Sequence, residues 1–246
     1  MARRPRVLLA GGWYHVVNRG NRREDIFRTD TDRRRFLGRL AELPERFRTE
    51  VHAFVLMDNH FHLLLRTLDA NLSDAIRWLQ ISYSSAFNWA HRIHGHLFQG
   101  RFRSILLEDS HAVVEVARYL HLNPVRIGGL GLGKAEQRRA RVADIADPGA
   151  ALVLQRLRTL DAYPWSSWQV YSGAELAPPW LTAGVISGGS GGSTASKRRT
   201  ALREYTEAPI LQGRLDSPWE RVIGGLVLGS KEVASRWLVP AGASGA

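Results

Sequence analysis

The chain has 246 residues, of which 44% are hydrophobic, so it is long enough to bury a sizeable core without disulfides or metals. It contains no cysteine, which excludes disulfides, thiolate metal sites and cysteine nucleophiles. The formal net charge of +11 indicates an anionic partner, first of all nucleic acid, because Lys and Arg that neutralise phosphates release condensed counterions.

The chain begins with a basic arm that no acidic residue compensates before Glu24. Its arginines are Arg3, Arg4, Arg6, Arg19, Arg22 and Arg23. A GC-rich coding sequence would explain an excess of arginine, but it would not explain this clustering. The arm has no apolar run typical of a secretion signal, and no stretch of the chain is apolar enough to span a bilayer. We therefore expect a cytoplasmic, nucleoid-associated protein.

The first predicted elements alternate between strand and helix. Residues 13–18 are rich in aromatic and β-branched side chains and predict a strand, and helical spacing predicts a helix from Asp30 or Asp32 to Pro44. A hairpin follows, with strands at 51–57 and 60–66 and its turn at Asp58-Asn59. An apolar stripe at intervals of three and four then predicts a long helix over 71–93.

The next two elements complete a recognisable fold. Residues 96–108 alternate as a fourth strand, and Asp109 or Ser110 begins a helix that ends near Asn123, because Pro124 disfavours helical geometry before it. This order predicts an α+β fold with a ferredoxin-like split βαβ core, in which a four- to five-stranded antiparallel sheet carries its helices on one face.

The chain divides by composition into three segments. Residues 1–130 form the predicted catalytic core, and residues 131–162 form a charged, helix-prone insertion. Residues 163–246 form a C-terminal extension that we expect to be mostly helical or irregular, with a flexible Gly- and Ser-rich loop at 187–196.

The strongest local signal for chemistry is the pair His60 and His62 around Phe61. Because side chains of a strand alternate between faces, both imidazoles face the same side of the predicted sheet. Two converging imidazoles suit a divalent metal. By itself the pair is more typical of solvated or hydrogen-bonded surface histidines than of a metal site, so it requires a partner.

The partner comes from the helix that ends before Pro124. Glu115, Tyr119 and Asn123 recur every four residues beside its apolar stripe, so Tyr119 can reach the open face of the sheet. Asn123 lies one turn further and offers a carbonyl oxygen as a third metal ligand. The alternative is that Tyr119 is a boundary aromatic residue and Asn123 only ends the helix. A tyrosine hydroxyl needs a metal to attack a phosphodiester at neutral pH, since its ordinary pKa is about 10.

Polar and basic residues could form a track for a DNA backbone. They belong to the basic arm, to the turn after the first strand and to one face of the fourth strand, namely Arg3, Arg4, Arg6, Asn18, Arg19, Arg22, Arg23, Gln99, Arg101 and Arg103. For any one of them a solvated cationic face is an equally good interpretation. An exposed Trp89, Trp165 or Trp168 could stack on bases, although core packing is the better expectation for each.

Four segments resemble, in order, the signatures of the REP-associated tyrosine transposases, relatives of the single-strand insertion-sequence transposases in the HUH endonuclease superfamily. They are Tyr14-His15-Val16-Val17-Asn18-Arg19-Gly20-Asn21-Arg22, Val55-Leu56-Met57-Asp58-Asn59-His60-Phe61-His62-Leu63-Leu64, Gly95-His96-Leu97-Phe98-Gln99-Gly100-Arg101-Phe102 and Tyr119-Leu120-His121-Leu122-Asn123-Pro124-Val125-Arg126. The resemblance covers about the first 130 residues, and Pro164-Trp165-Ser166-Ser167 extends it. The insertion after Leu130 is longer than in compact members of the family.

The resemblance implies a ferredoxin-like core and a Mg²⁺ or Mn²⁺ ion held by His60, His62 and Asn123. It implies that Tyr119 is the nucleophile and forms a 5′-phosphotyrosine. The implied substrate is single-stranded DNA with a hairpin of the repetitive extragenic palindrome type. We expect no obligate protein partner, and either a monomer or a homodimer.

Three functions follow as hypotheses. The first is a metal-dependent endonuclease and strand transferase that nicks and rejoins single-stranded DNA. The second is a hairpin-binding module of the same fold with little or no cleavage activity, and the third is a metallonuclease in which water attacks instead of tyrosine. The complete set of His60, His62, Tyr119 and Asn123 favours the first.

Overall fold

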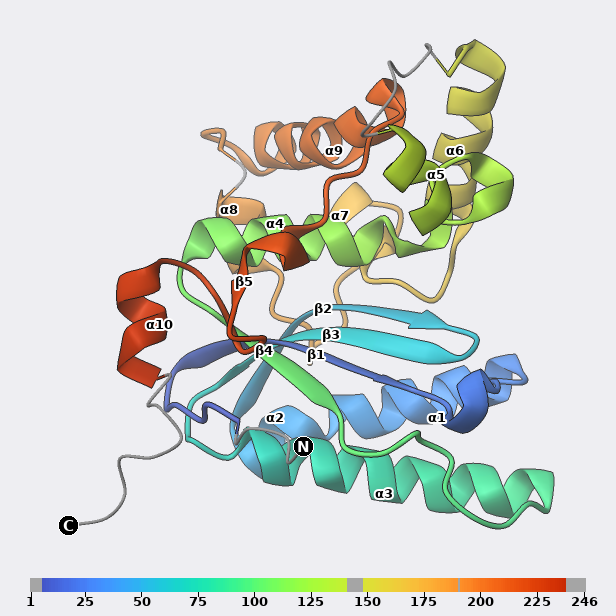
Figure 1. Ribbon diagram of the computed structural model, residues 1–246, viewed down its shortest axis with the longest axis vertical. Helices are drawn as coiled ribbons and strands as arrows, with labels where there is room; N and C mark the ends of the chain where they lie inside the picture. The colour runs from blue at the N-terminus through green and yellow to red at the C-terminus, as the bar shows by residue number, and fades with distance from the viewer. Residues whose placement is uncertain (1–5, 141–147, 190, 238–246) are drawn as a thin grey trace.

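A computed structural model describes residues 6–140, 148–189 and 191–237, and it places one twisted sheet between two helical layers (Figure 1). The sheet has six strands in the order β2-β3-β1-β4-β6-β5. Their bounds are β1 Gly12–Arg19, β2 Thr49–Met57, β3 His60–Thr67, β4 Arg103–Leu107, β5 Val222–Ile223 and β6 Val227–Leu228. The helices of the first half are α1 Asp30–Ala41, α2 Leu43–Phe47, α3 Leu72–His91 and α4 Ser110–His121.

The second half of the chain is mainly helical, as predicted. Its helices are α5 Lys134–Ala140, α6 Ala150–Ala162, α7 Trp168–Ser172, α8 Gly184–Gly189, α9 Ala195–Gln212 and α10 Lys231–Trp237. Short 3₁₀ turns are η1 Asn21–Arg23, η2 Asn123–Val125, η3 Gly128–Leu130 and η4 Pro218–Arg221. Of the loop expected at 187–196, residues 187–189 belong to α8 and residues 195–196 to α9.

The predicted ferredoxin-like core is confirmed by strands β1 to β4, which pair antiparallel in the order β2-β3-β1-β4. Two details of the prediction are wrong. The sheet has six strands instead of four or five, because β6 pairs parallel with β4 and β5 pairs antiparallel with β6. The helices cover both faces, because α1, α2 and α3 lie on one side and α4 on the other (Figure 1).

The two faces of the sheet carry separate hydrophobic cores because neighbouring residues of a strand point in opposite directions. On β3, Phe61 and Leu63 belong to the core under α1 and α3, whereas Leu64 belongs to the core under α4. His62, two residues before Leu64, therefore faces α4. The alternation along β3 that predicts one face for His60 and His62 therefore places both on the side of α4.

Helix α4 is positioned by clear start and stop signals. The Asp109 carboxylate accepts a 2.8 Å hydrogen bond from the backbone N–H of Ala112 and caps the first turn. The helix ends at His121, close to the position expected from Pro124, and a 3₁₀ turn begins at Asn123. Buried Val113, Val116 and Leu120 hold α4 on the sheet, so its length fixes where Tyr119 lies.

The fourth strand is shorter than predicted. It covers only Arg103–Leu107, and upstream of it the chain makes a single bridge between Phe98 and Gly20. Gly100 has φ +147°, which interrupts the extended run. Gln99 consequently lies in a loop, not on the strand face that carries Arg103. Within the described residues, no helix is long and apolar enough to cross a membrane.

Candidate active site

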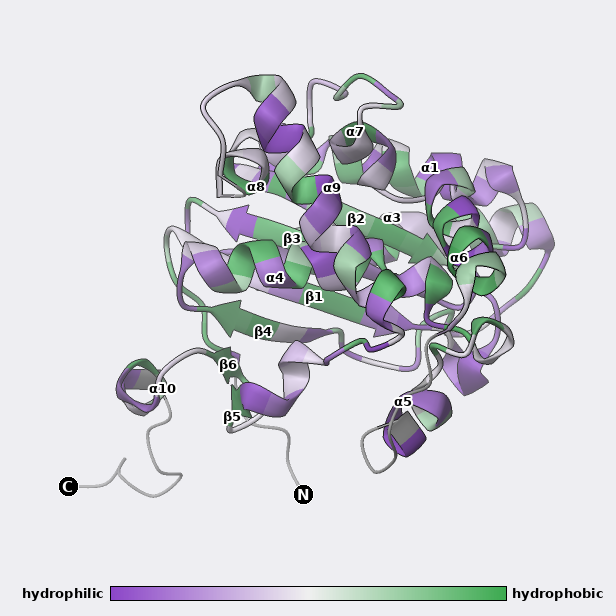
Figure 2. Cartoon of the chain, turned by 90° about the horizontal axis from the view of Figure 1, so that it is seen from above, coloured by the Kyte–Doolittle hydropathy of each residue, from purple (hydrophilic) through white to green (hydrophobic). Residues whose placement is uncertain are grey.

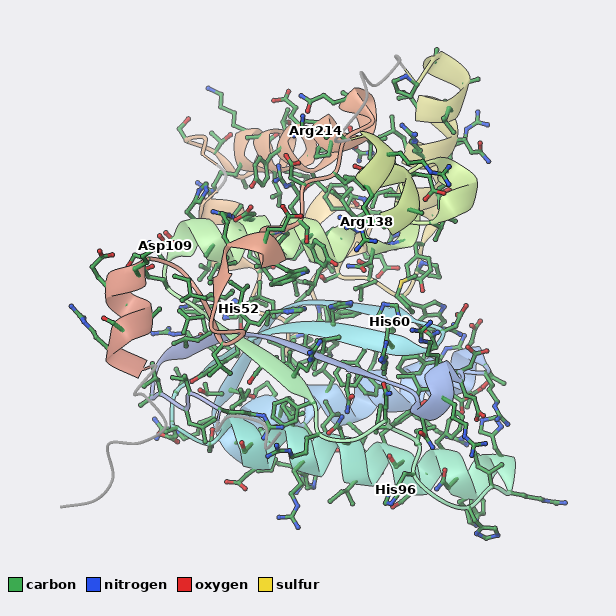
Figure 3. All side chains as sticks on the ribbon, in the orientation of Figure 1. His52, His60, His96, Asp109, Arg138 and Arg214 are labelled. Atoms are coloured by element: carbon green, nitrogen blue, oxygen red, sulfur yellow. The ribbon has the colours of Figure 1, made fainter. Side chains whose placement is uncertain are left out.

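The candidate metal pair lies on the α4 face of the sheet, at the start of β3. In the strand register His62 stands opposite Val17 and His60 opposite Arg19. The imidazole rings of His60 and His62 have their centroids 5.1 Å apart. Figure 3 shows His60 at one end of the sheet, where the hairpin between β2 and β3 turns. The predicted pair therefore occupies one face, as the strand period requires.

Neighbouring side chains orient both imidazoles. The Nδ1 of His60 lies 2.7 Å from the Oδ1 of Asn59, which can only accept, so Nδ1–H donates and Nε2 carries the lone pair. The Nδ1 of His62 lies 2.8 Å from the Nε2 of His15. Burial lowers the pKa of His15 to about 3, so its ring is neutral and the two histidines share one proton.

This arrangement fits a divalent metal. If His62 donates through Nδ1 to His15, its Nε2 carries the lone pair, as the Nε2 of His60 does. Such hydrogen bonds from the second ring nitrogen are the usual support of metal-binding histidines. The other nitrogen of His15, Nδ1, is buried without a hydrogen-bond partner. Among the described residues, the buried His15 ring therefore forms a hydrogen bond only with His62, and this bond orients both rings.

Tyr119, on α4, contacts the histidine pair through His62. Its ring packs edge-on against His62, with centroids 6.0 Å apart, and its side chain is only 8% exposed. The guanidinium of Arg126 lies over the Tyr119 ring, 4.6 Å from the centroid. Burial lowers the pKa of Arg126, and electrostatic attraction to the neighbouring Tyr119 raises it by a smaller amount. The candidate nucleophile therefore lies between a histidine of the metal pair and the half-buried guanidinium of Arg126.

A residue of the C-terminal extension completes this cluster. Trp219 stacks on His15 with ring centroids 4.3 Å apart and an interplanar angle of 19°. It also meets Tyr119 edge-on at 4.9 Å. Next to it, Arg221 forms an ion pair with Glu115 of α4 and so fastens the η4 turn to the helix that carries Tyr119. The candidate site is thus built by segments that lie far apart in the sequence, since Trp219 follows Tyr119 by 100 residues.

A pocket of about 580 Å³ opens beside these rings. His15, His62 and Tyr119 line it together with three arginines, Arg6, Arg101 and Arg103. Its remaining wall comes from apolar side chains of β4 and from the segment around β5 and β6, including Phe102, Ile105, Trp219, Val222, Gly224, Gly225 and Leu226. A pocket with a nucleophile, imidazoles and a cationic rim is suited to a phosphodiester.

Asn123, the expected third ligand, is placed differently. Its side chain is 9% exposed, and its Nδ2 donates to the carbonyls of Tyr119 at 2.8 Å and Leu120 at 3.3 Å. It does not line the pocket. Because the amide nitrogen is used to satisfy the end of α4, Oδ1 is the only amide atom that remains for a metal. The structure therefore brings His62 and Tyr119 into contact but leaves the ligand role of Asn123 a prediction.

The predicted DNA-binding residues divide into groups. Arg6, Arg101 and Arg103 gather at the pocket, and Arg6 also lies over the Phe102 ring at 3.8 Å. Arg19, Arg22, Arg23 and Gln99 are exposed on the turn after β1 and the loop beside it, where the Arg19 Nε donates to the Gln99 Oε1 at 2.5 Å. Arg3 and Arg4 lie outside the described residues.

Asn18 does not present its amide to a partner. It is 7% exposed, its Nδ2 donates to the carbonyl of Gly100 at 2.9 Å, and its Oδ1 accepts from the backbone N–H of Arg19. Both ends of the amide are therefore used within the chain to hold the loop before β4. We assign Asn18 a structural role at this position and omit it from the proposed DNA surface.

Sequence reasoning missed two members of the cluster. Trp219 lies in a Ser-Pro-Trp segment without any periodic pattern, so no signal in the sequence links it to Tyr119. Arg126 stands at the end of the Asn-Pro-Val-Arg segment. The 3₁₀ turn Asn123–Val125 brings its guanidinium back over the ring of Tyr119, seven positions earlier. The signal that the sequence offers is the position of Arg126, two residues after the Pro124 that ends the helix.

Comparison with known proteins places this chain. Residues 10–123 match the family model described as transposase IS200 like. A solved structure described as a REP-associated tyrosine transposase bound to a REP hairpin is similar to the chain, with 19% sequence identity and a TM-score of 0.49. That similarity covers 75% of this chain and 93% of the other. No curated protein matches.

Residues 10–123, which include strands β1 to β4 and helix α4, are similar to the IS200-like transposases. The matched segment ends at Asn123 and includes His60, His62 and Tyr119, whereas Arg126 and Trp219 lie beyond it.

Proposed function

We propose that this protein is a metal-dependent single-stranded DNA endonuclease and strand transferase that acts through Tyr119. The observation that supports this most directly is the contact of the Tyr119 ring with His62 in one pocket with Arg101 and Arg103. A nucleophile, two oriented imidazoles and a cationic rim are the parts that phosphodiester cleavage through tyrosine requires.

Mg²⁺ or Mn²⁺ is the proposed cofactor. His60 and His62 would hold it through Nε2, and the Oδ1 of Asn123 is the proposed third ligand. When bound, the metal supplies electrostatic stabilisation for the charge that develops on the phosphoryl oxygens. Two imidazoles leave coordination positions for phosphate oxygen and water, which suits a metal that prefers oxygen.

The chemical step is carried by Tyr119. Its hydroxyl oxygen attacks the phosphorus and forms a P–Oη bond while the bond from phosphorus to the 3′ oxygen breaks. The phenol proton is released to water, and the departing 3′ oxygen takes a proton, so that the products are a 5′-phosphotyrosine and a free 3′-hydroxyl. Since the phosphodiester energy is conserved in the covalent adduct, a 3′-hydroxyl can attack it later and rejoin DNA without ATP.

Positive side chains would hold the DNA in place for this step. Arg101 and Arg103 at the pocket can contact the phosphates that flank the scissile bond. The net charge of +11 favours binding of a polyanion to the protein as a whole. The proposed substrate is single-stranded DNA with a hairpin of the repetitive extragenic palindrome type, which rests on the four signature segments. Protein partners are not needed for this reaction.

The test is direct. The protein is incubated with a labelled hairpin oligonucleotide carrying single-stranded flanks and with Mn²⁺, and a denaturing gel is inspected for a covalent protein–DNA band. We expect the band with wild type, its loss in Tyr119→Phe with hairpin binding retained, and loss of cleavage in His60→Ala. Tyr205→Phe is the matched control, because Tyr205 is a half-buried tyrosine of α9 beside Arg118 of α4 and outside the pocket.

The other two functions are outcomes of the same experiment. Hairpin binding without any cleavage by wild type would support the binding module. Cleavage that persists in Tyr119→Phe without an adduct would support hydrolysis by water. A band that forms equally in Tyr119→Phe would assign the nucleophile to another residue and refute the role of Tyr119.

A further inference from the structure

The outer face of α3 carries an exposed indole that the fold does not use. Trp89 is 82% exposed, whereas the other tryptophans with described side chains pack against one of the two cores. Leaving an aromatic side chain of this size in water forgoes the free energy that its burial would supply. The expectation that Trp89 packs in the core is therefore wrong, and its position calls for a partner.

The surroundings of Trp89 are strongly cationic. Residues 75–107 contain no Asp or Glu. Within that run Arg77 and Arg92 are exposed on α3 and at its C-terminal cap, and His94 and His96 are exposed in the loop that follows. Arg92 is the left-handed C-cap of α3, and its backbone N–H donates to the carbonyl of Trp89 at 3.4 Å. The charged side chains of this run are all positive and so favour a polyanion, whereas the basic turn η1 is followed directly by the exposed carboxylates Glu24 and Asp25.

Hydrogen bonds join this end of α3 to the basic turn after β1. The Nδ2 of Asn88 donates to the carbonyl of Gly95 at 3.0 Å and fixes the loop behind Trp89. The loop then pairs with the turn, because the backbone N–H of Asn21 donates to the carbonyl of Leu97 at 2.8 Å. Trp89 and the arginines of η1 therefore belong to one continuous edge of the molecule.

The same edge leads to the candidate active site. Gly20 donates its backbone N–H to the carbonyl of Asn59 at 2.9 Å, and Asn59 is the residue that orients His60. In the sheet, Arg19 stands opposite His60. A strand of DNA that runs from the pocket over Arg19 and η1 would therefore reach the loop after α3 and Trp89.

We propose that Trp89 is a stacking platform for an unpaired base of the bound DNA, with Arg92 contacting a neighbouring phosphate. This deepens the proposed function and rests on it for the choice of DNA as substrate. Stacking of a base on an aromatic side chain tolerates any base, because every base has a flat face. The platform therefore adds affinity and holds the strand, while sequence is selected elsewhere.

The test compares equilibrium binding of a fluorescent oligonucleotide by wild type, Trp89→Ala and Trp89→Phe, with EDTA present so that no cleavage occurs. Stacking contributes about 1–3 kcal/mol per base in alanine substitutions, so we expect Trp89→Ala to raise Kd by about 5- to 150-fold. Trp89→Phe retains a flat ring and is expected to retain most of the affinity. Leu176→Ala is the matched control, because Leu176 is a 95% exposed apolar residue in the extension.

Two further measurements identify the occupant. A hairpin with single-stranded flanks should show the effect, whereas a blunt duplex of the same sequence should not. Arg92→Ala should lower the slope of log K against log salt by about one, because it removes one phosphate contact. An unchanged Kd in Trp89→Ala would overturn the proposal. So would a change of oligomeric state in sedimentation, which would assign this face to contact between copies of the chain.

These outcomes separate the platform from the catalytic proposal. An adduct on Tyr119 together with a neutral Trp89→Ala would refute the platform and leave the enzyme in place. A large effect of Trp89→Ala on binding without any adduct would support the platform and refute the enzyme.

Discussion

Trp219 links the C-terminal extension to the candidate nucleophile, and Trp219→Ala tests whether this contact orients Tyr119. The substitution removes two ring contacts, the stack on His15 at 4.3 Å and the edge-on contact with Tyr119 at 4.9 Å. Aromatic pairs contribute about 0.5–1.5 kcal/mol each, so the two together contribute about 1–3 kcal/mol. If that energy holds the Tyr119 ring in its reactive position, the single-turnover rate of adduct formation should fall by about 5- to 150-fold.

The assay is the rate of covalent band formation at saturating hairpin DNA and Mn²⁺, with Kd measured separately. We expect the rate to fall while Kd stays within about twofold, and Trp219→Phe to recover most of the rate because it keeps a ring between His15 and Tyr119. Trp180→Ala is the control: it removes a half-buried indole that packs on Phe54 in the opposite core. An unchanged rate in folded Trp219→Ala would refute the reasoning. A faster rate would show instead that the indole shields the site.

Three further predictions concern single buried groups. His15→Ala removes the partner of the His62 Nδ1, and we expect Mn²⁺ affinity measured by calorimetry to fall by about 10- to 100-fold. Burial alone would raise the pKa of Asp32, but hydrogen bonds from His91 and Thr29 outweigh it and lower the pKa. Its ionised form therefore stabilises the fold above pH 4, and urea unfolding should show a loss of about 1–3 kcal/mol in Asp32→Asn at pH 7 that shrinks as the pH falls below 4. Burial lowers the pKa of His121 to about 3, so the unfolded chain binds the extra proton between pH 6.5 and 3 and stability falls on acidification. His121→Gln should make the free energy of unfolding less dependent on pH in that window, by about 1.4 kcal/mol per pH unit, and an unaltered slope would contradict the neutral state of the buried ring.

Much of the core could be predicted because its signals are local. On β3 the period of two placed His60 and His62 on one face, and the same alternation sent Phe61 into the opposite core. The start of α4 followed from Asp109, and its end followed from Pro124. These residues act through bonds to their own neighbours, which is why the sequence alone was sufficient.

The errors arise where the structure depends on distant parts of the chain. Strands β5 and β6 have two residues each, too short for any alternation, and they form only because β4 offers them an edge. The fourth strand was predicted too long because alternation continued through Gly100, whose φ of +147° interrupts it. Which helix covers which face is likewise decided by packing, since the stripe of α4 fits either side of a sheet.

The C-terminal extension belongs to the same packed unit as residues 10–123, the segment that matches the family model. The core under α4 contains Val116 and Leu120 of that helix together with Leu160 of α6, Trp168 of α7 and Ile210 of α9. Strands β5 and β6 extend the catalytic sheet at its edge (Figure 2). Removing the extension would therefore expose the outer face of the helix that carries Tyr119 and one wall of the pocket. The residues that surround the nucleophile are drawn from the whole chain, so the chemistry of the matched segment cannot be separated from the fold of the rest.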